Sequence, residues 1–149
     1  MAQTYFGSTL RTGSGTLTDT TDGGFVVVSQ TTTVTTAAAG TATSATITIP
    51  SSSQIIQFLV DMVQDEVVGG GTATTIPVTI GTAAAGTQYL SATDVFAGGR
   101  AALSFTAAQL TAMSDVGANQ SVVITADPNG TISTTQAIIR LTVVYAQKV

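Results

Sequence analysis

Residues 136–147 read QAIIRLTVVYAQ, and the alternation within this stretch decides the fold. One face of a strand would carry Ala137, Ile139, Leu141, Val143 and Tyr145. The opposite face would carry Ile138, Arg140, Thr142 and Val144. Because apolar groups lie on both faces, we expect a sandwich core on one side and a neighbouring subunit on part of the other.

A second strand with a turn precedes this stretch. Residues 121–126 are rich in β-branched side chains, and residues 127–130 read Asp-Pro-Asn-Gly, a turn with proline and glycine in favourable places. The sequence therefore predicts that 121–126 and 136–147 form a β-hairpin, or a slightly wider loop of that kind.

Further strands are predicted upstream at 25–28, 31–36, 45–49, 54–63, 74–80 and 89–90. In 45–49, Ile47 and Ile49 share one face and threonines take the other. Pro77 cannot donate a ladder hydrogen bond, so we expect 74–80 to lie at a sheet edge.

Residues 54–63 have apolar side chains on both faces. If the alternation is regular, Ile56 lies on the same face as Phe58, Val60 and Met62. An amphipathic helix is the rival interpretation, but the Ile, Val and Phe content favours a strand in or near a sheet centre.

One short helix is predicted after Thr106. Thr106 is a suitable N-cap, and Gln109 stands three residues on as its capping-box partner. Leu110 and Met113 are its apolar residues, and Gly117 follows its end. The helix should be about two turns long.

Together these signals predict a mainly β chain, an antiparallel β-sandwich of jelly-roll-like type with one short helix. Residues 25–149 form the sandwich domain. Residues 1–24 carry few apolar side chains and are expected to form an extended N-terminal arm. Tyr5 and Phe6 have no local core to join, so they either fold back onto the sandwich or dock on a partner. We expect a docked arm, with Tyr5, Phe6, Leu10, Ile138 and Val144 as interface residues.

Composition excludes many functions. Of 149 residues only 8% are charged, against roughly 25% in an average domain, and threonine takes about a fifth of the positions. With no His and no Cys, the chain cannot build a Ser-His-Asp nucleophile, a histidine or thiolate zinc site, a haem ligand or a disulfide. We expect no catalytic site, no metal and no cofactor.

Charge and hydropathy bear on partners and location. The net charge is −4, and the basic residues Arg11, Arg100, Arg140 and Lys148 lie far apart in the chain, so no nucleic-acid partner is expected. No apolar run approaches the roughly 18 residues of a membrane-spanning helix. No secretion signal is visible at the first residues, which favours synthesis in a cytoplasm.

The acidic residues offer two weak candidates for chemistry. Asp61, Asp65 and Glu66 could supply the carboxylates of a glycosidase, but the chain has no Trp and only three Tyr to bind sugars. We expect this cluster to be a solvated strand end or a charge that discourages edge pairing. Asp19 and Asp22 near a glycine turn lack the closing Glu of a calcium loop, so we expect a polar turn there.

A family resemblance adds to these inferences. The segments that carry it are Ile49-Pro50, three small polar residues, the 54–63 strand, a glycine break, residues 75–82 and Tyr89-Leu90. In these segments the chain resembles the β-sandwich virion structural proteins of tailed bacteriophages. The Gly130-Thr131 loop and the end at 140–147 are similar as well. The resemblance covers roughly residues 45–147.

This resemblance implies an assembly role in a virion, without catalysis. It favours a capsid decoration (cement) protein that binds the major capsid protein as a homo-oligomer, with a trimer favoured. Alternatives are a tail, neck or fibre component, a carbohydrate-binding adhesin module that the scarcity of Trp and Tyr disfavours, and, weakest, a small hydrolase.

Overall fold

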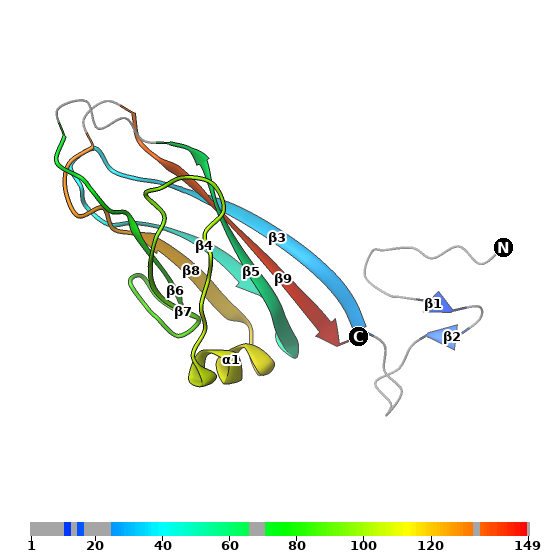
Figure 1. Cartoon of the computed structure of the whole chain (residues 1–149). Helices are drawn as coiled ribbons and strands as arrows, with labels where there is room; N and C mark the ends of the chain where they lie inside the picture. The colour runs from blue at the N-terminus through cyan, green and yellow to red at the C-terminus, as the bar shows by residue number, and fades with distance from the viewer. Residues whose placement is uncertain (1–10, 13–14, 17–24, 66–70, 133–134, 149) are drawn as a thin grey trace.

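A computed structural model describes residues 11–12, 15–16, 25–65, 71–132 and 135–148. Figure 1 shows two antiparallel sheets packed against each other, with one short helix at one end. This confirms the predicted β-sandwich. The elements are β1 (Arg11–Thr12), β2 (Gly15–Thr16), β3 (Phe25–Thr35), β4 (Thr43–Ile49), β5 (Ser53–Gln64), β6 (Pro77–Gly81), β7 (Leu90–Asp94), α1 (Ala107–Ser114), β8 (Gln120–Ala126) and β9 (Ile138–Lys148).

The two sheets of the sandwich differ in size and regularity. One has three strands in the order β3-β9-β5, and the other has four in the order β4-β8-β6-β7. β9 pairs with β3 along its whole length without a register shift, whereas its pairing with β5 contains two. The three interior strands, β9 in one sheet and β8 and β6 in the other, therefore have partners on both edges.

The core lies between the sheets and is built on the inner face of β9. All five side chains assigned to this face by their alternation are buried, namely Ala137, Ile139, Leu141, Val143 and Tyr145. Ile49, Ile80 and Ile124 of the opposite sheet are buried without measurable exposure. Each such side chain contributes about 1.5–3 kcal/mol to the free energy of folding.

The predicted hairpin between residues 121–126 and 136–147 is wrong. β8 and β9 belong to different sheets, and the segment between them crosses the edge of the sandwich. Its turn is held by the segment just ahead of β6, the neighbour of β8 in the four-stranded sheet, because Asn129 Oδ1 accepts hydrogen bonds from the backbone N–H groups of Thr74 and Thr75 at 2.9 and 3.0 Å. The eleven residues between the strands easily span the roughly 10 Å between packed sheets.

The predicted edge position of Pro77 is also wrong. β6 lies inside its sheet, between β8 and β7. Pro77 is tolerated because it is the first residue of β6, where no ladder donor is lost, and its carbonyl accepts from the Asp127 N–H at 3.0 Å.

β5 is a strand, as predicted, but its two faces do not alternate regularly. A register shift lies between Ile55 and Gln57, so that Ile55 is buried while Ile56 is 50% exposed. The inserted residue moves Ile56 away from the core face that Phe58, Val60 and Met62 share. The assignment of Ile56 to that face is therefore wrong.

The helix begins as predicted. The Thr106 hydroxyl accepts from the Gln109 N–H, and Gln109 Oε1 accepts from the Thr106 N–H, which completes the capping box. Met113 is buried, but Leu110 is exposed. Gln109 takes the second buried position, because its Nε2 donates to Thr87 O and Ser91 Oγ, both at 3.0 Å.

The N-terminal part of the sandwich is simpler than expected. The two predicted strands at 25–28 and 31–36 are one continuous strand, β3. Ahead of it, β1 and β2 pair antiparallel as a minimal two-stranded ladder. Tyr5, Phe6 and Leu10 lie outside the described residues, so the docking of the arm stays a prediction.

Within the described part of the chain, no helix is long and apolar enough to cross a membrane.

Two adjacent valines of β9 give a matched test of this packing. Val143 faces the core and is fully buried, whereas Val144 faces outward and is half-buried. We expect Val143→Ala to lower the free energy of unfolding by about 2 kcal/mol through lost burial and a cavity. Val144→Ala should cost less than half as much. Urea denaturation of both variants measures the difference, and equal losses would contradict the assigned faces.

Candidate functional site

The sandwich leaves one broad face of the three-stranded sheet uncovered by the other sheet. We call it the outer face. It comprises Val27, Ser29, Thr31, Thr33 and Thr35 of β3, Ile138, Arg140, Thr142 and Val144 of β9, and Ile56, Gln57, Leu59 and Asp61 of β5. Among these thirteen side chains, only Asp61 and Arg140 are charged, and they are paired with each other. The outer face is thus a mostly uncharged surface of threonine and aliphatic groups.

The two β9 residues expected at an interface, Ile138 and Val144, both lie on the outer face and are half-buried. They lie near opposite ends of β9, about 20 Å apart at 3.4 Å per residue. Arg140 and Thr142 stand between them. The structure therefore places the two residues on one face but in two separate apolar patches.

The patch around Val144 is enlarged by residues that were not singled out from the sequence. Val27 is 62% exposed and pairs with Ala146 across the β3-β9 ladder. Ile56, displaced by the bulge in β5, is exposed near Val144, which pairs with Gln57. Residues 25–28 read Phe-Val-Val-Val, with apolar side chains on both faces, so the sequence pattern gave no signal for the exposure of Val27.

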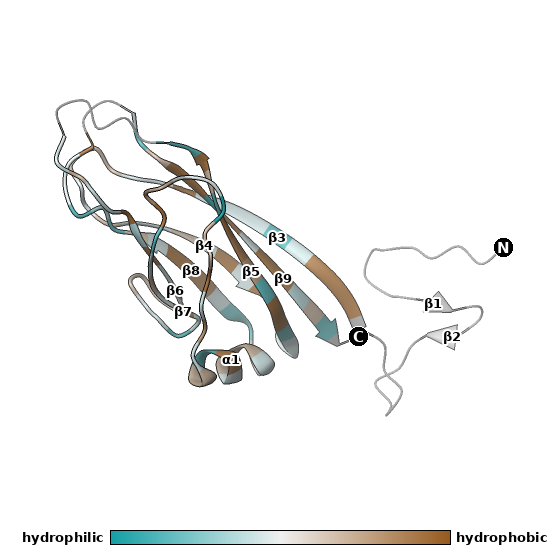
Figure 2. Ribbon diagram, viewed as in Figure 1, coloured by the Kyte–Doolittle hydropathy of each residue, from teal (hydrophilic) through white to brown (hydrophobic). Residues whose placement is uncertain are grey.

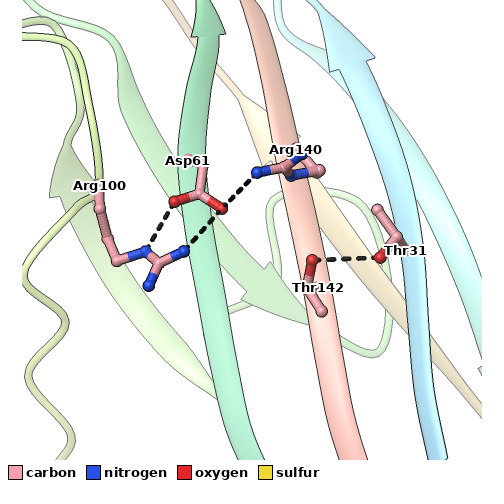
Figure 3. A network of polar contacts seen from close by, with 5 residues as sticks. All are labelled: Thr31, Asp61, Arg100, Arg140 and Thr142. Atoms are coloured by element: carbon pink, nitrogen blue, oxygen red, sulfur yellow. Dashed lines mark hydrogen bonds and ion pairs between the residues drawn. The ribbon is translucent and has the colours of Figure 1, made fainter.

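A charged cluster lies on the side of the outer face formed by β5. Figure 3 shows Asp61 of β5 between Arg140 of β9 and Arg100, which follows β7 in the chain. Arg100 Nε donates to Asp61 Oδ1 at 2.7 Å, and Arg140 Nη2 donates to Asp61 Oδ2 at 3.1 Å. The Asp61 side chain is only 12% exposed, against 61% for Arg100 and 44% for Arg140.

This geometry determines the protonation of Asp61. The hydrogen bond from Arg100 is the largest cause that holds the pKa of the Asp61 carboxyl below its usual value of 3.8, and Arg140 acts in the same direction against the effect of burial. Since both oxygens accept from guanidinium groups and the pKa is lowered, Asp61 is a poor general acid or base near neutral pH.

The interpretation of Asp61 as part of a solvated strand end is therefore wrong. Asp61 is buried and ion-paired, whereas Asp65 is exposed, and Glu66 lies outside the described residues. A charged residue in the middle of an apolar strand was the signal for such pairing, and Arg140 in β9 carries the same signal.

The segment around Arg100 also covers the edge of β5. The Met62 N–H donates to Gly99 O at 2.7 Å, and the Ala101 N–H donates to Val60 O at 2.9 Å. Gly98 and Gly99 adopt φ values of 75° and 73°, which favour glycine and turn the chain toward β5. Asp61 thus holds a loop, a strand edge and the central strand together.

The remaining polar groups of the outer face are mainly hydroxyls. Thr31 Oγ1 and Thr142 Oγ1 lie 3.1 Å apart across the β3-β9 ladder and share a hydrogen bond (Figure 3). Such hydroxyls can both donate to and accept from a polypeptide surface, and the N–H groups of Arg100 and Arg140 that do not face Asp61 can donate to it. The chemistry of the outer face suits protein contact.

Metal chemistry has no candidate in the described segments, where no three acidic side chains gather in an arrangement that could hold a metal ion. Comparison of the chain with protein-family models, with curated proteins and with solved structures finds no match. A functional proposal therefore depends on the geometry of the chain itself and on the resemblance stated above.

The Asp61 cluster predicts a pH-dependent stability. In the folded state Asp61 stays ionised at pH values below its usual pKa. Its ion pairs therefore add fully to the free energy of unfolding above pH 3.8, and this stabilisation is lost as the pH falls through the lower folded-state pKa. We expect Asp61→Asn to lower the free energy of unfolding by about 2 kcal/mol at pH 7. The gap between the variant and the parent chain should close at lower pH.

Urea titrations at pH 7 and pH 3 measure this gap. The matched control is Asp65→Asn. Asp65 is exposed and directly follows the last residue of β5, and this change should alter the free energy of unfolding by less than about 0.5 kcal/mol. An Asp61→Asn variant as stable as the parent at pH 7 would show that the cluster contributes nothing.

Proposed function

We propose that this protein is a structural component of a bacteriophage virion, a capsid decoration (cement) protein. It binds the major capsid protein and stabilises the shell, and it reaches the virion after synthesis in the host cytoplasm. The observation that carries the proposal is the outer face, a broad surface of threonine and aliphatic side chains in which the one acidic group is neutralised. Such a surface can cover a neighbouring protein while presenting little charge, because Asp61 offsets one of the two arginines that flank it.

The rest of the fold supports a passive structural role. The core between the sheets is one apolar cluster whose residues run from Val34 to Tyr145 in the sequence. The chain has no cysteine and no histidine, so neither a disulfide nor a metal bound by histidine or thiolate holds this core together. A shell component must stay folded outside a cell, where neither redox control nor chaperones act. The resemblance of residues 45–147 to tailed-bacteriophage virion proteins points in the same direction.

An adhesin role has less support. Sugar-binding modules stack aromatic rings on their ligands, but Tyr89 and Tyr145 are buried in the core. Phe58 packs against Tyr89 with ring centroids 5.7 Å apart. These aromatic groups stabilise the sandwich and offer no platform to a carbohydrate.

Labelling of particles tests the proposal. An antibody raised against the purified chain is applied to a particle fraction from the source culture and is viewed by negative-stain electron microscopy. We expect the label on the heads of tailed particles. Label on tails or necks would favour the alternative of a tail, neck or fibre component. Particles that carry no label, with the protein in the soluble cell fraction, would overturn a virion role.

The arm gives a second prediction. Tyr5, Phe6 and Leu10 together could bury about 300–400 Å², worth several kcal/mol at about 25 cal/mol per Å² before the entropy of ordering is subtracted. We expect a chain that starts at Gly24 to keep the thermal melt of the full chain but to bind particles more weakly. A lowered melting temperature would instead assign the arm to the core of its own chain, and unchanged binding would exclude it from the contact.

A further inference from the structure

One long hydrogen-bonding edge of the described fold is that of β3. In the order β3-β9-β5, β3 pairs with β9 on one side only. It is eleven residues long, which gives an edge of about 35 Å. Its backbone groups on the other side form a row that another strand could match.

β3 also lacks the features by which edge strands usually avoid pairing. It contains no charged residue and no proline, and its register against β9 has no bulge. The opposite edge of this sheet is different. β5 has two register shifts, and its edge is covered by the 99–101 segment and by the Val116 N–H, which donates to Ser53 O at 2.9 Å.

The edges of the second sheet are less suited to pairing. β7 has five residues, and its ladder with β6 is irregular. β4 has only seven residues and lies beside β3, where the Thr43 hydroxyl donates to Thr35 O at 2.8 Å, so this contact covers one end of the β3 edge as well. β3 is thus the longest regular edge, and it has the composition of a strand that is paired on both sides.

The sequence of β3 is compatible with itself in an antiparallel ladder. If two copies pair about Gln30, Ser29 of one lies opposite Thr31 of the other, and Val26 lies opposite Val34. Inner-face residues then meet inner-face residues, and outer-face residues meet outer-face residues. No like charges are opposed, which matters for a chain of net charge −4.

We propose that β3 pairs antiparallel with β3 of a second copy about a two-fold axis at Gln30. The two three-stranded sheets then form one continuous sheet with the order β5-β9-β3-β3-β9-β5. About ten backbone hydrogen bonds form along the new ladder. The pairing also covers Val26 and Val28, which are only half-buried in the single chain, beside the exposed Val27. Figure 2 shows this end of β3 as hydrophobic.

This contact has a consequence for assembly. A two-fold contact is isologous and produces dimers or assemblies of dimers, whereas a trimer requires a head-to-tail contact. The contact also leaves the outer face free, because it uses the edge of the sheet. It does not depend on the proposed virion role, and it can be tested on the purified chain alone.

The experiment places like charges on opposite positions of the ladder. Ser29 and Thr31 are exposed, so Ser29→Lys with Thr31→Lys changes the edge without disturbing the core. We expect the parent chain to sediment as a dimer and the lysine variant to show a dimer dissociation constant raised at least tenfold. The matching variant, Ser29→Glu with Thr31→Glu, should dissociate as well. An equimolar mixture of the two should restore the dimer, because opposite charges then face each other.

Because Ser29 and Thr31 also belong to the outer face, two controls separate the edge from the rest of that face. Ile138→Ser with Val144→Ser changes the outer face and should leave the dimer intact, and thermal melts should show that all variants fold. Restoration in the mixture supports the proposal. A parent chain that sediments as a monomer or a trimer, a dimer that survives the paired lysines, or a dimer lost only in the outer-face variant would each overturn it.

Discussion

The burial of the inner face of β9 is the interaction on which the two sheets depend. β9 is the only strand of the three-stranded sheet with partners on both edges, and its four inner side chains, with Ala137 just before it, are buried in the core between the sheets. Tyr145 adds a polar contact within this layer, because its hydroxyl accepts from Gln30 Nε2 at 2.6 Å. β3 and β5 are thereby held at fixed registers, and those registers define the outer face.

Local patterns were predictable from the sequence, whereas pairing partners were not. The inner face of β9, the faces of β4 and the capping box of Thr106 and Gln109 depend on residues within a few positions of each other, and all three were predicted correctly. The turn at 127–130 was also predicted from local residues and is present, but the chain then continues into the other sheet. Neither a proline-glycine turn nor an alternating pattern specifies which sheet receives the next strand.

The bulge at Ile56 and the Asp61 cluster show the same limit at the candidate site. An extra residue in a strand leaves no mark on an alternating pattern when both faces are apolar, so the exposure of Ile56 could not be predicted. Asp61 and Arg140 were visible as charges within apolar strands, but their partnership spans 79 residues, and that with Arg100 spans 39. The register of β5 on β9 brings Asp61 to Arg140, and the pairing of the 99–101 segment with the edge of β5 brings Arg100 to Asp61.

The long separation between β3 and β9, its ladder partner in the described part of the chain, bears on how the chain folds. Gln30 and Tyr145 are 115 residues apart, so loop closure must precede their contact, and folding should be slow compared with that of a helical domain. About 100 residues separate the two strands, and ribosomes add roughly 5–20 residues per second. For about 5–20 s of synthesis, β3 has no partner on either edge. During this interval an uncharged, valine-rich strand is open to nascent chains on neighbouring ribosomes, and a chaperone that shields residues 25–35 would raise the yield of native protein.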